Sequence, residues 1–441
     1  MNPLPRPATS PSALAGRYLR VRSRSRALAA PLSEADCQVQ SMPDASPVKW
    51  HLAHVTWFFE TMVLERHERA FKPHHPHFRV LYNSYYQQVG AQHPRPQRGL
   101  VSRPSLAEVM AYRAAVDDRV LALLHAPHAA EVDALVELGL QHEQQHQELL
   151  LTDVKHMLSC NPVEPVYQGG WRLAPVAPAA HGWVPFDGGT VEIGHPGDGF
   201  AFDNEGPRHS VLLRPYAIGN RLVTHGDWLA FVRDGGYADP RWWLAAGWDW
   251  RAQQRVEAPL YWRRSGDGRD DWQVFTLHGP APIDPHTPIV HVSYFEADAY
   301  ARWAAEQWGE PVRLPTEAEW EHAAAQDAGA RIAGGNFVET EALHPMPLPR
   351  IESGAMQLFG DVWEWTSSSY AAYPGFRAWD GAVGEYNGKF MVNQYVLRGG
   401  SCATPRDHIR PSYRNFFATD ARWQFSGLRL ARDLDRAMIA P

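Results

Sequence analysis

Residues 131–158, EVDALVELGLQHEQQHQELLLTDVKHML, decide the fold of the first part of this chain. Apolar residues recur in this stretch every three or four positions, which predicts one long amphipathic helix. His142 and His146 lie one turn apart, so their imidazoles project from the same face of that helix. Several leucines fall on about the same stripe, and we therefore expect this face to point into a protein core.

Three further segments with helical periodicity predict a bundle around this helix. They are residues 12–32, 46–66 and 105–124. Ser46 is expected to be the N-cap of the second segment, and Ser105 with Glu108 forms a capping-box pattern at the start of the third. Four such helices are typical of a four-helix bundle. The irregular stretch 77–104 is longer than a bundle connection needs to be, and long loops of that kind often carry function.

The 441 residues are enough for two or three domains, each with its own core. A helical domain over residues 10–160 is followed by a Pro- and Gly-rich stretch, 161–185, which is typical of a linker. Residues 186–435 combine short strand-like pieces and two helical segments with long Trp- and Gly-rich loops. The strand-like pieces are 188–194, 209–219, 394–400 and 427–432, and the helical segments are near 224–236 and 293–309. The expected fold class is therefore an α-helical bundle followed by an α+β domain rich in irregular structure.

Charge and cysteine content exclude several classes of protein. The net charge of −7 and pI of about 6.3 argue against nucleic acid as a partner. No apolar run approaches the length of a membrane span. Three scattered cysteines are too few for a disulfide framework and indicate a reducing, cytoplasmic location. The Arg- and Ser-rich stretch before Glu34 would also suit a transit peptide, but its helical spacing favours a first domain helix.

A metal site needs at least a third ligand beside His142 and His146. The second helical segment offers His54, which stands among aromatic residues on an apolar face. An unpaired imidazole would be costly there, and ligation of a metal removes that cost. His51 is the competing third ligand, although it lies off the aromatic stripe. Three histidines without a close carboxylate leave coordination positions open, as a catalytic site requires. On spacing alone, core or surface histidines remain the alternative.

Four motifs in the second half resemble, in order, the formylglycine-generating-enzyme fold, a variant of the C-type-lectin fold. They are RLPTEAEWEHAA (313–324), GDVWEWTSS (360–368), VLRGGSC (396–402) and GLRLAR (427–432). The helical half, with LAH ending at His54 and HxxxHxE beginning 88 residues later, looks like a DinB-like metal-binding bundle. This combination is similar to the iron-dependent sulfoxide synthases of ergothioneine biosynthesis. Those enzymes use O2 to join a thiol to the imidazole carbon of hercynine, which is N-trimethylhistidine.

The resemblance implies an Fe(II) cofactor with His54, His142 and His146 as its three ligands. Gln145 matches a residue that contacts hercynine. Glu148 is left open between a role beside the metal and a place on the solvated helix surface.

The segment YRNFF places Asn415, Phe416 and Phe417 where the family holds the trimethylammonium end of hercynine. Aromatic faces suit a quaternary ammonium, which cannot donate a hydrogen bond but is attracted to a ring quadrupole. The mycobacterial branch has Trp-Asp after its Asn, so the two phenylalanines remove a carboxylate. This departure favours the branch that uses free cysteine instead of a γ-glutamyl dipeptide. The segment LYNSYY agrees with that branch, which implies Tyr85 and Tyr86 as catalytic residues.

Arg98 and Arg103 are candidates to bind the carboxylate of the sulfur donor, with ordinary loop surface as the alternative. A selenoneine synthase, which takes a selenosugar as donor, shares the architecture and is a close alternative. A formylglycine generator would need a pair of cysteines, and only Cys402 lies beyond the linker. A lectin-like binding module and a zinc-dependent DinB-like thiol transferase are more distant alternatives. The oligomeric state is left open.

Overall fold

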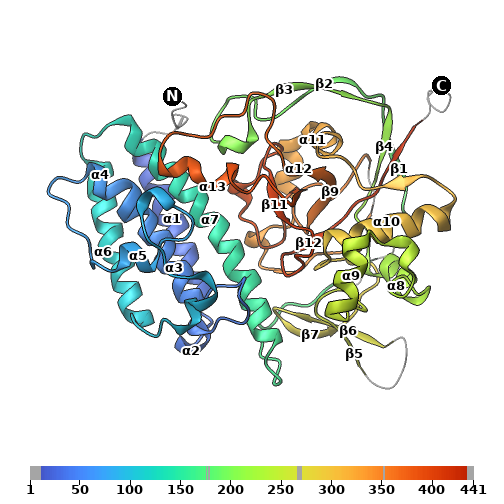
Figure 1. Cartoon of the computed structure of the whole chain (residues 1–441), viewed down its shortest axis with the longest axis horizontal. Helices are drawn as coiled ribbons and strands as arrows, with labels where there is room; N and C mark the ends of the chain where they lie inside the picture. The colour runs from blue at the N-terminus through green and yellow to red at the C-terminus, as the bar shows by residue number, and fades with distance from the viewer. Residues whose placement is uncertain (1–10, 175, 177–178, 266–270, 351–352, 435–441) are drawn as a thin grey trace. The chain divides into compact units, whose positions relative to one another are not determined.

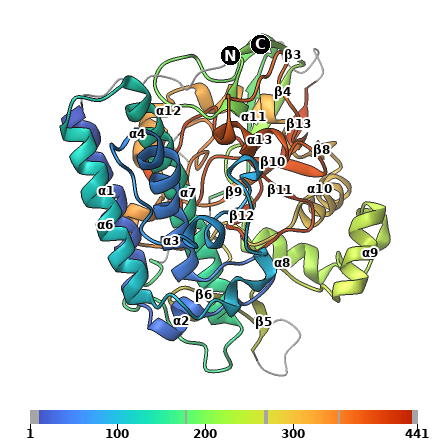
Figure 2. The ribbon, with the colours of Figure 1, turned by 60° about the vertical axis from the view of Figure 1, so that its left-hand side comes forward.

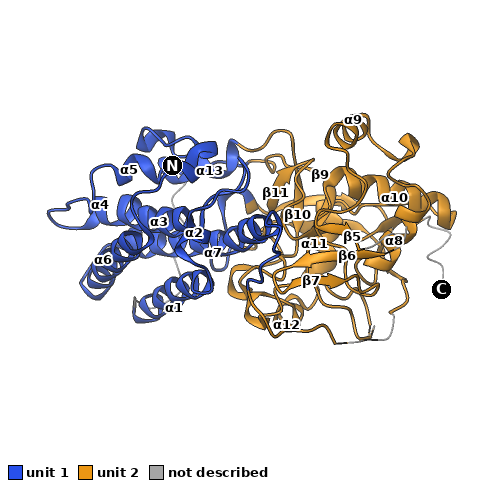
Figure 3. Ribbon diagram, turned by 90° about the horizontal axis from the view of Figure 1, so that it is seen from below, with its two compact units in different colours: residues 1–167, 197–204, 376–389 blue, residues 168–196, 205–375, 390–441 orange. Residues whose placement is uncertain are grey.

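The computed structural model describes residues 11–174, 176, 179–265, 271–350 and 353–434. The chain forms two compact units (Figure 3). Unit 1 contains residues 1–167, 197–204 and 376–389, and unit 2 contains residues 168–196, 205–375 and 390–441. Two short segments that follow residue 167 in the sequence, 197–204 and 376–389, thus belong to the helical unit.

Four long helices form the bundle that the sequence predicts (Figure 1). They are α1 (Pro11–Ala29), α3 (Val48–Phe58), α6 (Leu106–His125) and α7 (Ala130–Ser159). Helix α7 packs against α1 and α3, and α3 packs against α6. Helices α1 and α6 lie side by side (Figure 2). The Arg- and Ser-rich N-terminal stretch therefore folds as a helix of the bundle, as its spacing predicts.

The two expected helix starts have different outcomes. The capping box of Ser105 and Glu108 is confirmed. The N-cap expected at Ser46 is wrong, because α3 begins at Val48 and no side chain caps it. The Ser46 main-chain N–H donates to Asp153 Oδ2 at 2.8 Å, and its hydroxyl accepts from Arg98 at 2.9 Å. These tertiary contacts use the groups that a cap would need.

After Phe58, helix α3 continues as a π-helical segment, η1 (Phe59–Leu64), and then as α4 (Glu65–His67), where the helical stretch ends. The ring of Phe59 lies against Gly139 of α7, where a Cβ atom would stand only 2.5 Å from a ring carbon. Glycine at this position therefore permits the close approach of α3 and α7. The remaining short elements of unit 1 are α2 (Glu34–Gln38), α5 (Phe78–Leu81), η2 (Gln87–Val89), η3 (Arg95–Leu100), η7 (Ala382–Gly384) and α13 (Glu385–Gly388).

A buried ionic network joins three helices of the bundle. Glu143 of α7 accepts hydrogen bonds from Arg22 of α1 at 2.8 Å and from Arg113 of α6 at 2.9 Å. Burial alone would raise the pKa of Glu143, but the two arginines outweigh it and lower that pKa to about 2. Arg22 also donates to Asp117 at 2.6 Å. The network orients the side of α7 next to the histidine pair.

Unit 2 is an α+β domain with four small sheets. The first has the order β1-β4-β13-β8, the second β11-β10-β9-β12, the third β2-β3 and the fourth β5-β6-β7. The strands are β1 (Trp183–Phe186), β2 (Gly189–Ile193), β3 (His209–Leu213), β4 (Tyr216–Gly219), β5 (Trp262–Arg264), β6 (Trp272–Thr276), β7 (Gly279–Pro282), β8 (Val312–Arg313), β9 (Trp363–Ser369), β10 (Gln394–Arg398), β11 (Asn415–Ala418), β12 (Ser426–Gly427) and β13 (Ala431–Asp433). All described pairings are antiparallel except that of β12 with β9.

The helices of unit 2 include the two that the sequence predicts, α8 (His225–Arg233) and α10 (Tyr294–Trp308). The others are α9 (Ala245–Gln254), α11 (Glu317–Ala325) and α12 (Ala328–Gly334), with the short turns η5 (Pro240–Trp242), η6 (Val338–Thr340) and η8 (Arg406–His408); η4 (Asp203–Glu205) bridges the boundary of the units in sequence. Among the helices that the structure describes, none is long and apolar enough to cross a membrane.

Candidate metal centre

Three histidines of unit 1 converge on one point. His54 of α3 and His142 and His146 of α7 each offer a ring nitrogen, and these nitrogens lie within 4.8 Å of one another. The Nε2 atoms of His54 and His142 are 3.2 Å apart. Two nitrogens bound to one metal at ~2.0–2.1 Å and at tetrahedral or right angles stand roughly 3 Å apart. The observed separation therefore fits a pair of ligands on a shared metal ion.

The tautomer of His54 is set by a main-chain carbonyl. Its Nδ1 lies 2.6 Å from the carbonyl oxygen of Tyr82, which can only accept, so Nδ1 carries the proton. The Nε2 lone pair is thereby left for a metal. The ring is stacked between Trp50, at a centroid distance of 4.5 Å, and Trp57, at 5.5 Å. Burial holds the pKa of His54 well below its usual range, which keeps the imidazole neutral and able to ligate.

The other two histidines are also neutral. Burial lowers the pKa of His142 to about 4, and its buried Nδ1 has no hydrogen-bond partner among the described residues. Burial, followed by His142 and His54, holds the pKa of His146 well below its usual range. When each neutral imidazole directs its unprotonated nitrogen at this point, the lone pairs repel one another, and a shared cation removes that repulsion. The donor set fits a divalent transition metal.

His51, the competing third ligand, occupies a different place. Its Nδ1 lies 2.8 Å from His146 Nδ1, and its Nε2 lies 2.9 Å from Asp153 Oδ2. Both of its ring nitrogens are thus engaged, one of them by a member of the cluster, and His51 is not among the histidines whose nitrogens converge.

The predicted tyrosines lie in the loop that follows α5. Tyr86 is buried, and its ring packs against Trp57 at 5.6 Å and Phe58 at 6.4 Å. Because Trp57 also stacks on His54, one indole ring joins Tyr86 to the metal centre. Burial raises the pKa of Tyr86 far above its usual range, so its phenol stays protonated. The Tyr85 hydroxyl accepts a hydrogen bond from Arg95 at 2.5 Å.

The two predicted arginines have different surroundings. Arg98 is buried, donates to Ser46 and Ser84 at 2.9 Å each, and lies 3.4 Å above the ring of Trp50. No carboxylate forms an ion pair with it within the described chain. Burial lowers its pKa to about 9. Arg103 is exposed, and the structure does not bring it to this group.

Sequence reasoning missed Arg95, which supplies the second guanidinium beside Tyr85. Its NH2 group contacts the Asp44 carbonyl, and its buried Nε has no partner among the described residues. The Pro-flanked RPQR pattern could have singled it out, because both arginines fall in one turn of 3₁₀ helix, η3.

Gln145 is half-buried on α7, one turn from His142, and Glu148 is buried on the same helix.

The other predicted residues lie in unit 2, on strand β11. The ring of Phe416 stacks on Tyr370 at a centroid distance of 4.0 Å and on Phe390 at 5.8 Å. Phe417 meets Trp423 edge-on at 5.9 Å. The side-chain oxygen of Asn415 accepts from the Phe416 main-chain N–H at 2.9 Å. Phe416 and Phe417 follow each other on the strand, so they point to opposite faces of the sheet and pack against different aromatic residues.

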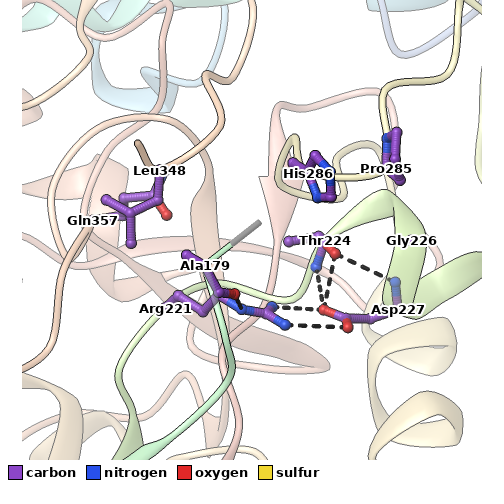
Figure 4. A pocket seen from close by; sticks show the side chains of 9 residues that line it. All are labelled: Ala179, Arg221, Thr224, Gly226, Asp227, Pro285, His286, Leu348 and Gln357. Carbon is purple, nitrogen blue, oxygen red and sulfur yellow. Dashed lines mark hydrogen bonds and ion pairs between the residues drawn. The ribbon is translucent and has the colours of Figure 1, made fainter. Parts of the chain in front are cut away.

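Unit 2 also has a cavity of about 230 Å³ (Figure 4). The Arg221 guanidinium in its wall is matched by Asp227, at 2.6 and 3.2 Å, and also donates to the carbonyls of Ala179 and Leu222. Because this charge is already neutralised, we assign no chemistry to the cavity.

Comparison with known proteins agrees with this arrangement. Residues 17–150 match the DinB superfamily model, and residues 173–434 match the model of the sulfatase-modifying factor enzyme 1-like domain. The hercynine oxygenase of Mycolicibacterium thermoresistibile is 34% identical to this chain, and the match covers 97% of this chain and 96% of that protein. This chain belongs to the hercynine oxygenase family.

The hercynine oxygenase of Mycobacterium tuberculosis is similar to the same extent, with 33% identity over 97% of this chain and 100% of the relative. A formylglycine-generating enzyme of Streptomyces coelicolor is 30% identical over 58% of this chain and 91% of its own length. That match covers too little of this chain to include both of its domains. The expected fold class and the family resemblance are therefore confirmed. Cys402, the single cysteine of unit 2, is buried, so the pair that a formylglycine generator would need is missing.

Proposed function

We propose that this chain is a non-haem iron(II) hercynine oxygenase of ergothioneine biosynthesis, which joins the sulfur of a thiol to the imidazole C2 of hercynine and yields a sulfoxide. One observation carries the proposal. Three neutral histidines bring their ligand nitrogens within 4.8 Å of one another, in a chain that aligns with hercynine oxygenases over 97% of its length. The substrates are small molecules.

His54, His142 and His146 would hold the iron by one nitrogen each. With no carboxylate in the cluster, they leave positions open for a thiolate and for O2. Iron(II) bound there supplies the redox chemistry that couples O2 reduction to bond formation between sulfur and carbon. Gln145 lies one turn from His142 on α7 and is the proposed contact for hercynine.

Tyr86 and Tyr85 are the proposed proton donors. Burial raises the pKa of Tyr86, so its phenol stays protonated and releases the proton only to an oxygen that is more basic than the phenolate. Arg95 orients the neighbouring phenol by donating to Tyr85 Oη. We assign the catalytic proton to this pair and not to a histidine, since burial holds the histidine cluster neutral.

Arg98 is the proposed site for the donor's carboxylate. Its guanidinium is buried and has no ion pair with any carboxylate of the described residues, so an anionic ligand would supply the missing counter-charge. This favours a thiol that carries a carboxylate, such as cysteine, over a neutral selenosugar. Arg103 was predicted to share this role, and we instead propose that Arg95 does so.

Strand β11, with Asn415, Phe416 and Phe417, is the proposed site for the trimethylammonium group of hercynine, and Phe416 is the ring that we assign to it. Ring faces attract a quaternary ammonium without needing a hydrogen bond. The Phe416 ring is held in place by stacking on Tyr370, which limits the conformational entropy it can lose on binding.

Anaerobic reconstitution with Fe(II) tests the proposal. The loaded protein is mixed with hercynine, O2 and, in separate reactions, cysteine, γ-glutamylcysteine or a selenosugar, and the products are identified by mass spectrometry. We expect a coupled sulfoxide with cysteine. Efficient coupling only with the selenosugar would reassign the chain as a selenoneine synthase.

His54→Ala, His142→Ala and His146→Ala should each abolish iron binding and turnover. His125→Ala, at an exposed position of α6, is the matched control and should change neither. Wild-type protein that binds no Fe(II) would refute the proposed function and favour a binding module.

A further inference from the structure

His51 and Asp153 form a chain of hydrogen bonds that ends on the metal ligand His146. Asp153 Oδ2 lies 2.9 Å from His51 Nε2, and His51 Nδ1 lies 2.8 Å from His146 Nδ1. Both His51 and Asp153 are buried, on α3 and α7. Asp153 Oδ2 also accepts from the main-chain N–H of Ser46 at 2.8 Å. Asp153 and His51 therefore each have a fixed partner on both sides.

The direction of each hydrogen bond follows from the chemistry of the groups. An ionised carboxylate only accepts, so His51 Nε2 carries a proton and donates it to Asp153. A neutral imidazole has one N–H, which leaves Nδ1 of His51 as an acceptor. The proton between His51 and His146 must then belong to His146 Nδ1, and His146 Nε2 is left with a free lone pair.

The reverse arrangement would prevent metal binding through this nitrogen. If Nδ1 of His51 carried the proton, His146 Nδ1 would have to accept it, and the proton of a neutral His146 would move to Nε2. The space beside His51 and His146 is only about 10 Å³, room for at most one water, so solvent offers no network of alternative partners.

We propose that Asp153 and His51 are positioning residues that hold His146 in the Nδ1–H tautomer and so present its Nε2 to the metal. The inference rests on the proposed function for the presence of a metal at the three-histidine cluster. It gives a role to His51, the competing third ligand in the sequence analysis. Removal of such outer partners commonly weakens metal binding about 10- to 100-fold.

The test is anaerobic titration of the apoprotein with Fe(II) against a chromophoric chelator. His51→Leu and Asp153→Ala should each weaken Fe(II) binding by about 10- to 100-fold. His51→Gln should recover most of the affinity, because its amide can accept from His146 and donate to Asp153. Gln147→Leu is the matched control, since Gln147 is a buried polar residue of α7 that lines the same space and bonds to Val21 and Ser25 of α1. Equal weakening by Gln147→Leu, or no rescue by His51→Gln, would overturn the proposed relay, that is, the chain of hydrogen bonds from Asp153 through His51 to His146.

A second measurement does not depend on variants that fold. Apoprotein labelled with ¹⁵N-histidine should show His146 with a protonated Nδ1 and an unprotonated Nε2, the signals being assigned by their loss in His146→Gln. A protonated Nε2 in the wild type would refute the relay. The two proposals fail separately: wild-type protein without Fe(II) affinity contradicts the proposed function, whereas normal wild-type affinity that His51→Leu leaves unchanged contradicts only the relay.

Discussion

Arg98→Met should weaken binding of the sulfur donor and, unusually for a buried site, stabilise the fold. Methionine keeps an unbranched side chain that can pack on Trp50 but removes the guanidinium. A hydrogen bond to a charged group contributes about 1.5–3 kcal/mol. The dissociation constant for cysteine should therefore rise by roughly 10- to 150-fold.

The effect on stability follows from the lowered pKa of Arg98. Burial first, and then Arg95, lower that pKa from 12.5 to about 9 in the folded protein. Below pH 9 the folded state therefore holds a charge that is more costly there than in the unfolded chain, and this cost disappears as the pH rises from 9 through 12.5. At pH 7 it amounts to at most roughly 5 kcal/mol.

Arg98→Met also loses favourable contacts. The hydrogen bonds to Ser46 and Ser84 contribute about 1 kcal/mol each, and stacking on Trp50 contributes about 1–2 kcal/mol. Because the cost of the charge is an upper limit, the balance is a gain of at most roughly 1–2 kcal/mol in the free energy of unfolding at pH 7.

The assay pairs anaerobic calorimetric titration of cysteine into the Fe(II)- and hercynine-loaded protein with urea unfolding of the apoprotein. Arg69→Met, at an exposed position without a role in the site, should alter neither quantity. A loss of stability together with unchanged cysteine binding would refute the reasoning. Arg98 would then stabilise the fold through its hydrogen bonds to Ser46 and Ser84 and would not bind the donor.

The remaining predictions concern the tyrosine loop and Phe416 of strand β11. Tyr85→Phe and Tyr86→Phe should preserve binding of both substrates but shift the products, measured by mass spectrometry, from the coupled sulfoxide to the sulfinic acid of the donor. If both variants keep the wild-type product ratio, neither tyrosine is the proton donor, and Tyr386 is the next candidate. Phe416→Ala should weaken hercynine binding by about 1–2 kcal/mol and affect cysteine much less, and equal weakening of both would indicate a role in the fold. Glu385 accepts from two main-chain N–H groups in the loop after Tyr86, at 2.7 and 2.8 Å, so Glu385→Gln should shift the product ratio in the same direction at unchanged Fe(II) affinity; an unchanged ratio would show that these contacts do not position the tyrosines.

Much of the fold could be predicted from the sequence because its signals are local. Helical periodicity placed the four long helices, and the strand-like pieces of unit 2 appear as β2, β3, β4, β10 and β13. The failed N-cap at Ser46 shows the limit of such signals. The pattern of serine before proline is local, but its hydroxyl and N–H are taken by Arg98 and Asp153, which lie 52 and 107 residues away in sequence.

The histidine cluster was predictable in part for the same reason. The spacing of His142 and His146 places them on one face of any helix, whatever surrounds it. Asp153 also lies two turns beyond His146 on α7 and could have been recognised as its neighbour in the chain of hydrogen bonds. No local pattern assigns the carbonyl of Tyr82 to His54, because main-chain groups carry no sequence signature.

The sequence by itself determined the helical bundle, the α+β unit, the pair of histidines on α7 and the family motifs, all of which depend on residues a few positions apart. Only the tertiary structure decided that His51 turns to His146 and Asp153, that Arg95 donates to Tyr85, and that residues 376–389 pack with the bundle. The physical reason is that neighbours across a helix interface depend on the rotation and axial offset of the packed helices. Those two quantities are set by side chains spread over the whole core, such as Gly139 against Phe59, and no single stretch of sequence contains them.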